Sequence, residues 1–128
     1  MKVLIDSSIW ISYFRNGDNE KILDFLIDEN QIVTNDIILA ELIPFLIIKN
    51  QKKIISLLEK IFKNPLTIDW QEIILMQTLC LKKGINGIGI PDLIIAQNCI
   101  DNHCKVFTSD NHFSQLKKIS KIEIFETS

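Results

Sequence analysis

Four acidic residues occupy positions at which their carboxylates could act together. Asp6 and Asp110 each come after an expected strand, and Asp92 stands near the expected start of a helix. Glu41 is the only charged residue in the apolar segment 37–48. Mg²⁺ and Mn²⁺ prefer oxygen donors, and such cations can promote phosphodiester cleavage by activating water and neutralising negative charge. We therefore predict a metal-dependent catalytic site formed by all four acids.

Each acid also has an ordinary structural interpretation. Asp6 and Asp110 are suitable N-cap residues, and Asp92 could simply interact favourably with a helix dipole. Glu41 could be a surface residue, although a carboxylate among so many apolar neighbours would cost several kcal/mol if it were buried without a partner. The functional interpretation therefore depends on all four acids meeting in one place.

The elements expected around these acids alternate between strands and helices. We predict strands at residues 3–5, 32–34, 66–68, 105–108 and 121–125. Helical patterns cover residues 9–14, 22–27, 37–48, 54–62, 70–83 and 91–102, and a short helix opens at residue 110. This alternation predicts an α/β fold with three layers, in which a central, mainly parallel sheet carries helices on both faces. In such sheets ligands bind beyond the carboxyl ends of the strands, which is where Asp6 and Asp110 fall.

The composition indicates one ordinary globular domain, residues 1–128. The chain is 47% hydrophobic and 23% charged, and its three cysteines contain no CxxC pair, which argues against a disulfide framework or a zinc knuckle. We see neither a secretory leader nor an apolar segment long enough to cross a membrane, and expect a cytoplasmic protein. The net charge of −2 does not exclude RNA, because setting aside four of the 16 acids leaves 12 facing 14 basic residues.

Four motifs together resemble the PIN-domain family, and in particular its VapC toxin branch. They are VLIDSS (residues 3–8), Glu41 within an apolar helix, PDLIIA (residues 91–96) and FTSDNHF (residues 107–113). The resemblance covers nearly the whole chain. It implies an Mg²⁺- or Mn²⁺-dependent endoribonuclease that acts on RNA, is usually a homodimer, and is encoded beside an antitoxin protein that blocks its site.

The resemblance also assigns residues. The family's acids fall on Asp6, Glu41, Asp92 and Asp110, and its supporting hydroxyl residues fall on Ser8 and Thr108. Many relatives carry another acid at the position of His112, which leaves open whether one or two metal ions bind. In the implied mechanism three aspartates hold the cation, and the glutamate orients or deprotonates the attacking water.

Two other functions fit parts of the pattern. The first is a PIN-like module that has weak or no catalysis and binds RNA or a protein. The second is a phosphatase with Asp6 as its nucleophile, but such enzymes of the haloacid dehalogenase type carry an aspartate two residues later, where this chain has Ser8. The phosphatase interpretation also gives no role to Glu41.

Overall fold

A four-stranded parallel sheet forms the centre of the molecule. The structure is a computed structural model, and it describes residues 1–127. The strand order is β3-β2-β1-β4, and every pairing is parallel. The strands are β1 (Val3–Ile5), β2 (Ile32–Thr34), β3 (Phe62–Lys63) and β4 (Lys105–Phe107). Leu4 of β1 is in register with Val33 on one side and Val106 on the other, so β1 is a central strand.

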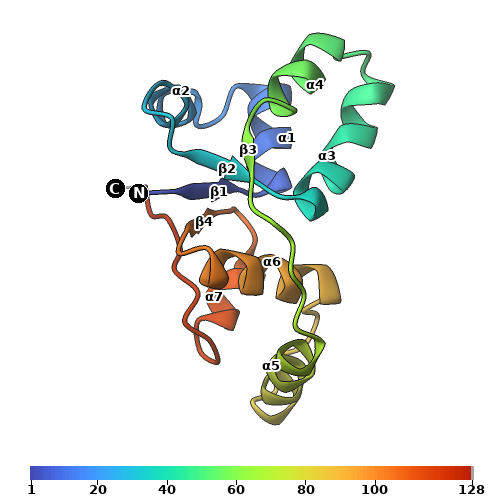
Figure 1. The fold of residues 1–128 in the computed structure, drawn as a ribbon, viewed down its shortest axis with the longest axis vertical. Coiled ribbons are helices and arrows are strands. Elements are labelled where there is room, and N and C mark those ends of the chain that lie inside the picture. Colours follow the sequence, from blue (N-terminus) through green and yellow to red (C-terminus); the bar gives the residue numbers. More distant parts are fainter. Residues whose placement is uncertain (128) are drawn as a thin grey trace.

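Helices cover both faces of this sheet. They are α1 (Ser7–Asn16), α2 (Glu20–Asp28), α3 (Asp36–Ile48), α4 (Lys52–Leu58), α5 (Trp70–Lys82), α6 (Ile90–Asp101) and α7 (Asn111–Leu116). The chain steps from β1 to β2 and β3 in one direction and then returns past β1 to β4. Right-handed connections therefore place α1 to α4 on one face and α5 to α7 on the other, as Figure 1 shows. The predicted three-layer α/β fold is confirmed.

The core explains why these segments fold as they do. All three residues of β1 are fully buried, as expected for the central strand of a parallel sheet covered on both faces. From α1, Trp10 is buried, and it stacks on the partly buried Phe14 with ring centroids 5.7 Å apart. Asn35 caps α3 by accepting a hydrogen bond from the Ile38 N–H at 2.9 Å. Within the described residues, no helix has the length and apolar character needed to span a membrane.

The third strand lies earlier in the chain than we predicted. It comprises Phe62–Lys63 rather than residues 66–68, and α4 ends at Leu58 rather than continuing to residue 62. The Asn64 N–H still donates to the Thr34 carbonyl at 2.8 Å, but Pro65 has no N–H with which to continue the ladder. The β-branched segment that follows instead packs its apolar side chains against the core.

Two further boundaries differ from the sequence-based expectation. The final edge strand at residues 121–125 is reduced to one parallel bridge between Ile124 and Val106, the middle residue of β4. Helix α6 begins at Ile90, so Pro91 occupies its second position and Asp92 its third. Asp92 remains in the first turn of that helix, as predicted.

The direction of the chain connections changes between the neighbouring strands β1 and β4. The chain leaves β1 towards α1 on one face, and it leaves β4 towards α7 on the other face. Adjacent parallel strands whose connections diverge in this way form the topological switch point at which α/β proteins bind ligands. Asp6 follows β1, and residues 108–110 follow β4, so both lie at this point.

Candidate active site

Asp6 lies at the centre of the candidate site. It is only 6% exposed and occupies the N-cap position of α1, but its side chain makes no capping hydrogen bond. Instead its Oδ2 accepts hydrogen bonds of 2.8 Å from the hydroxyls of Ser8 and Thr108. Burial raises the pKa of Asp6, and these two hydrogen bonds oppose the rise only in part. The structure therefore does not support the helix-cap interpretation of this carboxylate.

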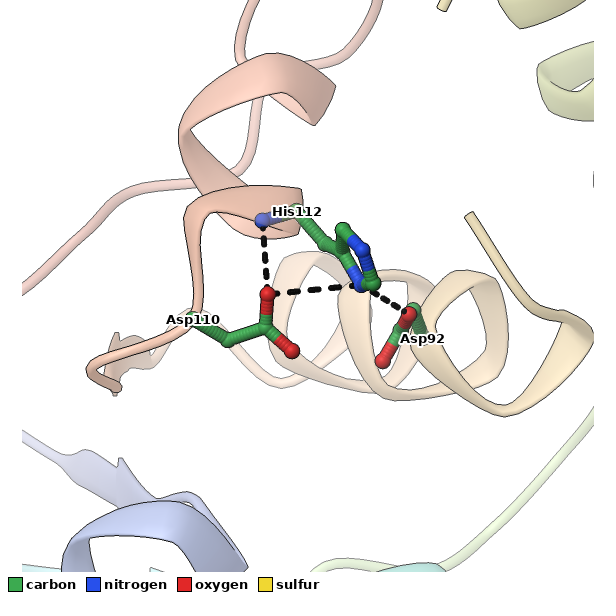
Figure 2. Close-up of side chains that lie close together, drawn as sticks. All are labelled: Asp92, Asp110 and His112. Carbon is green, nitrogen blue, oxygen red and sulfur yellow. Dashed lines mark hydrogen bonds and ion pairs between the residues drawn. The ribbon is translucent and has the colours of Figure 1, made fainter. Parts of the chain in front are cut away.

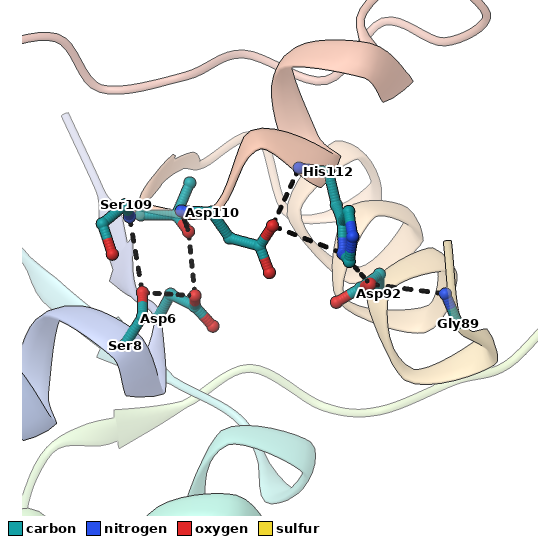
Figure 3. A network of polar contacts seen from close by, with 8 residues as sticks. Asp6, Ser8, Gly89, Asp92, Ser109, Asp110 and His112 are labelled. Carbon is teal, nitrogen blue, oxygen red and sulfur yellow. Dashed lines mark hydrogen bonds and ion pairs between the residues drawn. The ribbon is translucent and has the colours of Figure 1, made fainter. Parts of the chain in front are cut away.

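Thr108 joins Asp6 to Asp110. While its hydroxyl donates to Asp6, its Oγ1 accepts a 3.0 Å hydrogen bond from the Asp110 N–H. The Ser109 N–H makes a longer contact of 3.4 Å with the Ser8 hydroxyl oxygen. The loops after β1 and β4 are thus tied together by the two predicted supporting residues. Figure 3 shows Asp6 and Ser8 beside Ser109 and Asp110.

Asp92 and Asp110 face each other across His112. Asp110 is the N-cap of α7, and its Oδ1 accepts a 2.9 Å hydrogen bond from the His112 N–H. The His112 ring nitrogen Nδ1 lies 2.9 Å from Asp92 Oδ2 and 3.3 Å from Asp110 Oδ1. Asp92 Oδ2 also accepts a longer, 3.4 Å contact from the Gly89 N–H, next to the positive end of the α6 dipole. Figure 2 shows both carboxylates and the ring turned towards one another.

Glu41 lies at the exposed rim of the site, not in the core. Of the two interpretations left open for Glu41, the surface one is correct, because α3 turns this side chain outward while burying Ile38, Leu39, Leu42 and Leu46. Its Oε1 accepts a 3.3 Å hydrogen bond from the Ser7 hydroxyl at the start of α1. The pKa of Glu41 is raised by partial desolvation and then by repulsion from Asp6 and, more weakly, from Asp92. These repulsions place Glu41 near the other acids even though it is exposed.

The four acids repel one another and have no lysine or arginine partner within residues 1–127. Asp110 adds to the rise in the pKa of Asp6, just as Asp6 and Asp92 add to that of Glu41. Within residues 1–127, His112 is the only basic side chain in ion-pair contact with any of the four. Clustered oxygen donors without lysine or arginine suit a divalent cation, which would relieve both the repulsion and the cost of burial. The donor set therefore fits Mg²⁺ or Mn²⁺.

Sequence reasoning found the acids but not every residue that organises them. His112 was not among the predicted site residues, yet it contacts two of the acids directly. Its position two residues after Asp110, on the first turn of a short helix, is the signal that could have identified it. The hydroxyl of Ser7 and the N–H of Gly89 were also missed, and their contacts depend on tertiary structure that no local pattern encodes.

Comparison with known proteins identifies the family of this domain. A family model described as PIN domain matches residues 3–119, which is nearly the whole chain. The chain belongs to the PIN-domain family. No curated protein matches this PIN domain.

Solved structures with the same fold come from two-component complexes. VapBC2 from Rickettsia felis, solved with a DNA fragment from the promoter, matches with a TM-score of 0.78 and 20% identity over 100% of both chains. DNA-bound VapBC from Salmonella typhimurium matches with a TM-score of 0.69 and 20% identity, covering 98% of this chain and 97% of that one. VapBC-1 from nontypeable Haemophilus influenzae gives a TM-score of 0.68 and 23% identity over 98% of each chain. At these identities the likeness concerns the fold alone.

Proposed function

We propose that this PIN domain is a metal-dependent endoribonuclease that cleaves RNA phosphodiester bonds and serves as the toxin of a toxin-antitoxin pair. The proposal is supported by the approach of Asp92 and Asp110 to the same His112 nitrogen, and by the hydrogen bonds that link Asp6 through Thr108 to Asp110. Glu41 lies at the rim, where it accepts a hydrogen bond from Ser7. An acid cluster with no lysine or arginine partner among the described residues is costly unless a cation completes it. Its position beyond the strand ends is open to a substrate.

Each acid has a distinct role in this proposal. Asp6, Asp92 and Asp110 would hold Mg²⁺ or Mn²⁺, directly or through water. When bound, the cation would stabilise the charge that develops on the attacked phosphate. Glu41 is suited to orient or deprotonate the attacking water, because its carboxylate is exposed at the rim of the site, where it accepts a hydrogen bond from Ser7. The hydroxyls of Ser8 and Thr108 would fix the orientation of the Asp6 carboxylate.

The partners are part of the same proposal. The neighbouring structures are described as VapBC assemblies, and we propose by analogy that a cognate antitoxin protein binds this chain. We further propose that the toxin is a homodimer and works in the cytoplasm. Light scattering of the purified chain across a concentration series would test the dimer.

An apolar groove on the α1 and α4 side of the molecule supports a protein partner. It is lined by Trp10, Tyr13, Phe14, Leu57 and Phe62, among others. Two of these side chains are more than half exposed, Leu57 at 61% and Phe62 at 63%. Exposed aromatic and aliphatic side chains gathered in a groove usually mark an interaction surface. We propose that the antitoxin covers this groove.

The test of the enzymatic proposal is RNA cleavage by matched variants. Total RNA is incubated with the wild type, Asp92→Asn and Asp101→Asn, each with Mg²⁺ or Mn²⁺ and each with EDTA. Asp101 is an exposed residue at the other end of α6, so it controls for loss of a charge from the same helix. We expect cleavage by the wild type and Asp101→Asn only when metal is present, and at least about a hundredfold loss for Asp92→Asn.

Mapping the cut ends would then define the substrate. Equal cleavage by the wild type and Asp92→Asn would rule out the assigned site. Absence of metal-dependent cleavage in the wild type would favour the alternative of a PIN module that only binds RNA or protein.

A further inference from the structure

The His112 side chain lies between the carboxylates of Asp92 and Asp110. An ordinary surface histidine has no such pair of contacts. Its backbone N–H is held by Asp110 Oδ1 at 2.9 Å, which fixes the start of α7 against that acid. Its ring then reaches across to Asp92 on α6, a residue 20 positions earlier in the chain. The ring is partly buried, with 35% of the side chain exposed. Two carboxylates from different elements therefore converge on one ring nitrogen.

The spacing of these atoms matches the coordination shell of a small divalent cation. Donors at neighbouring corners of an octahedron with bonds of about 2.1 Å lie about 3.0 Å apart. The His112 Nδ1 lies 2.9 Å from Asp92 Oδ2 and 3.3 Å from Asp110 Oδ1. One ligand atom from each of the three residues can be chosen so that all lie within 4.8 Å of one another. A single cation can therefore be shared by the three side chains with little movement.

The other ring nitrogen of His112, Nε2, faces away from the two carboxylates. A Cβ atom added at Gly87 would lie 3.9 Å from His112 Nε2, so this nitrogen faces the loop between α5 and α6. A metal-bound imidazole is neutral and carries its proton on the nitrogen that does not bind the metal. The orientation seen in Figure 2, with Nδ1 towards the acids, is the one that ligation through Nδ1 requires.

We propose that His112 is a nitrogen ligand of the divalent cation and biases this site towards Mn²⁺ over Mg²⁺. This inference rests on the metal site of the proposed function and goes beyond it by adding a fourth ligand residue and a metal preference. Mg²⁺ binds oxygen donors and loses its water reluctantly, whereas Mn²⁺ accepts imidazole more readily. A histidine among the acids therefore changes which cation gains most from the site.

The same distances are compatible with one other role for His112, which would have the opposite effect on metal affinity. A protonated His112 could act as an internal counter-ion that pairs with Asp92 and Asp110 and must be displaced by the metal. Removing a ligand weakens metal binding, whereas removing a competing cation strengthens it. The sign of the change in affinity therefore decides between the two roles.

The experiment measures metal binding without RNA. Full-length wild type, His112→Ala, His112→Asp and His103→Asn are freed of metal and titrated calorimetrically with Mn²⁺ and, separately, with Mg²⁺. His103 is exposed and has a φ of 53°, a conformation that asparagine tolerates, so His103→Asn is a matched control. We expect His112→Ala to weaken Mn²⁺ binding about tenfold or more and Mg²⁺ binding much less. His112→Asp should lower the ratio of Mn²⁺ to Mg²⁺ affinity, while His103→Asn should match the wild type.

A spectroscopic measurement makes the result independent of how well the variants fold. Pulsed electron paramagnetic resonance of the wild-type Mn²⁺ complex should show coupling to an imidazole ¹⁴N nucleus, which should persist in His103→Asn and disappear in His112→Ala. Absence of this coupling in the wild type, or equal or tighter Mn²⁺ binding by His112→Ala, would overturn the inference but leave the nuclease proposal standing. Failure of the wild type to bind either cation would overturn both.

Discussion

At the scale of single residues, the burial of the Asp6 carboxylate carries a cost in stability. It is a nearly fully buried carboxylate, and its hydrogen bonds to Ser8 and Thr108 offset burial only in part, since its pKa remains raised. A buried acid that repels Asp110 and Glu41 does not help the metal-free chain to fold. The proposed cation would offset this cost. Residues selected for function commonly carry such a stability cost.

This cost predicts that the effect of Asp6→Asn on stability depends on pH. Because the folded-state pKa of Asp6 is raised, the folded protein binds this proton more tightly than the unfolded chain does. The stabilisation from the protonated acid is complete below the unfolded pKa and is lost as the pH rises through the folded pKa. We therefore expect Asp6→Asn to be more stable than the wild type at pH 7 in EDTA, with a difference that shrinks as the pH falls towards about 4.

Urea denaturation at a series of pH values measures this difference. Adding Mn²⁺ at pH 7 should reverse the order, because only the wild type keeps the full set of ligands. Asp101→Asn removes an exposed acid and should follow the wild type throughout. A metal-free Asp6→Asn protein that is less stable than the wild type at pH 7 would show that the carboxylate has a structural role.

The limits of sequence-based prediction are also clear at this scale. The strand-end positions of Asp6 and Asp110 identified them, because local patterns define where short buried strands stop. Glu41 was identified as the only charged residue in an apolar segment, but the sequence left open whether it is buried, and the structure places it on the surface. The contact of His112 with Asp92 joins residues 20 positions apart on two helices, and no local pattern predicts it.

At the scale of elements, a buried group of amides holds α6 against the strand ends. Asn98 of α6 accepts hydrogen bonds through Oδ1 from Asn35 at 2.9 Å and from Asn64 at 3.4 Å, and its Nδ2 donates to the Pro65 carbonyl at 3.0 Å. All three asparagines are buried. These contacts connect α6, which carries Asp92, to the segments that follow β2 and β3.

We expect Asn98→Ala to destabilise the protein by about 2–4 kcal/mol, because it leaves buried amide donors of Asn35 and Asn64 without their acceptor. Thr78→Ala is the control, since the Thr78 hydroxyl bonds only within its own helix, to the Ile74 carbonyl. That variant should change stability by less than about 0.5 kcal/mol. Urea denaturation of both variants is the measurement. Similar small losses in the two proteins would mean that the amide group does not anchor α6.

The positions of the helices were predicted better than the choice of the segment that pairs with β2. Helical periodicity and capping residues placed most helices within a few residues, because both signals are local. The strand after α4 was misplaced because Leu66 and Ile68 have the composition of a strand but lie beyond Pro65, which ends the pairing with β2. The neighbouring strand decides which residues join the sheet, and the sequence of the joining segment alone does not contain that information.

At the scale of the whole molecule, the two surfaces to which we assign functions lie in different places. The acids gather at the switch point between β1 and β4, whereas the apolar groove lies along α1, α4 and β3. Alternation of strands and helices predicted the layers that separate them. It could not predict the groove, because the exposure of Leu57 and Phe62 depends on how α4 and β3 are placed relative to α1.

This separation predicts that partner binding and catalysis can be changed independently. Phe62→Glu places a charge in the apolar groove, so we expect it to weaken binding of the cognate antitoxin at least about tenfold, which corresponds to about 1.4 kcal/mol. Metal-dependent RNA cleavage by the isolated toxin should be unchanged, because Phe62 lies outside the acid cluster. Ile48→Glu is the control, since this residue is 78% exposed at the end of α3 and is not among the lining residues of the groove.

The measurement is the dissociation constant of the toxin and antitoxin, with cleavage of the same RNA as the second readout. If Ile48→Glu weakened the complex as much as Phe62→Glu, the groove would not be the binding surface. If Phe62→Glu abolished cleavage as well, the two surfaces would be coupled. Inhibition by an antitoxin would then be explained by a change transmitted from the groove along α1, whose first residues Ser7 and Ser8 contact Glu41 and Asp6.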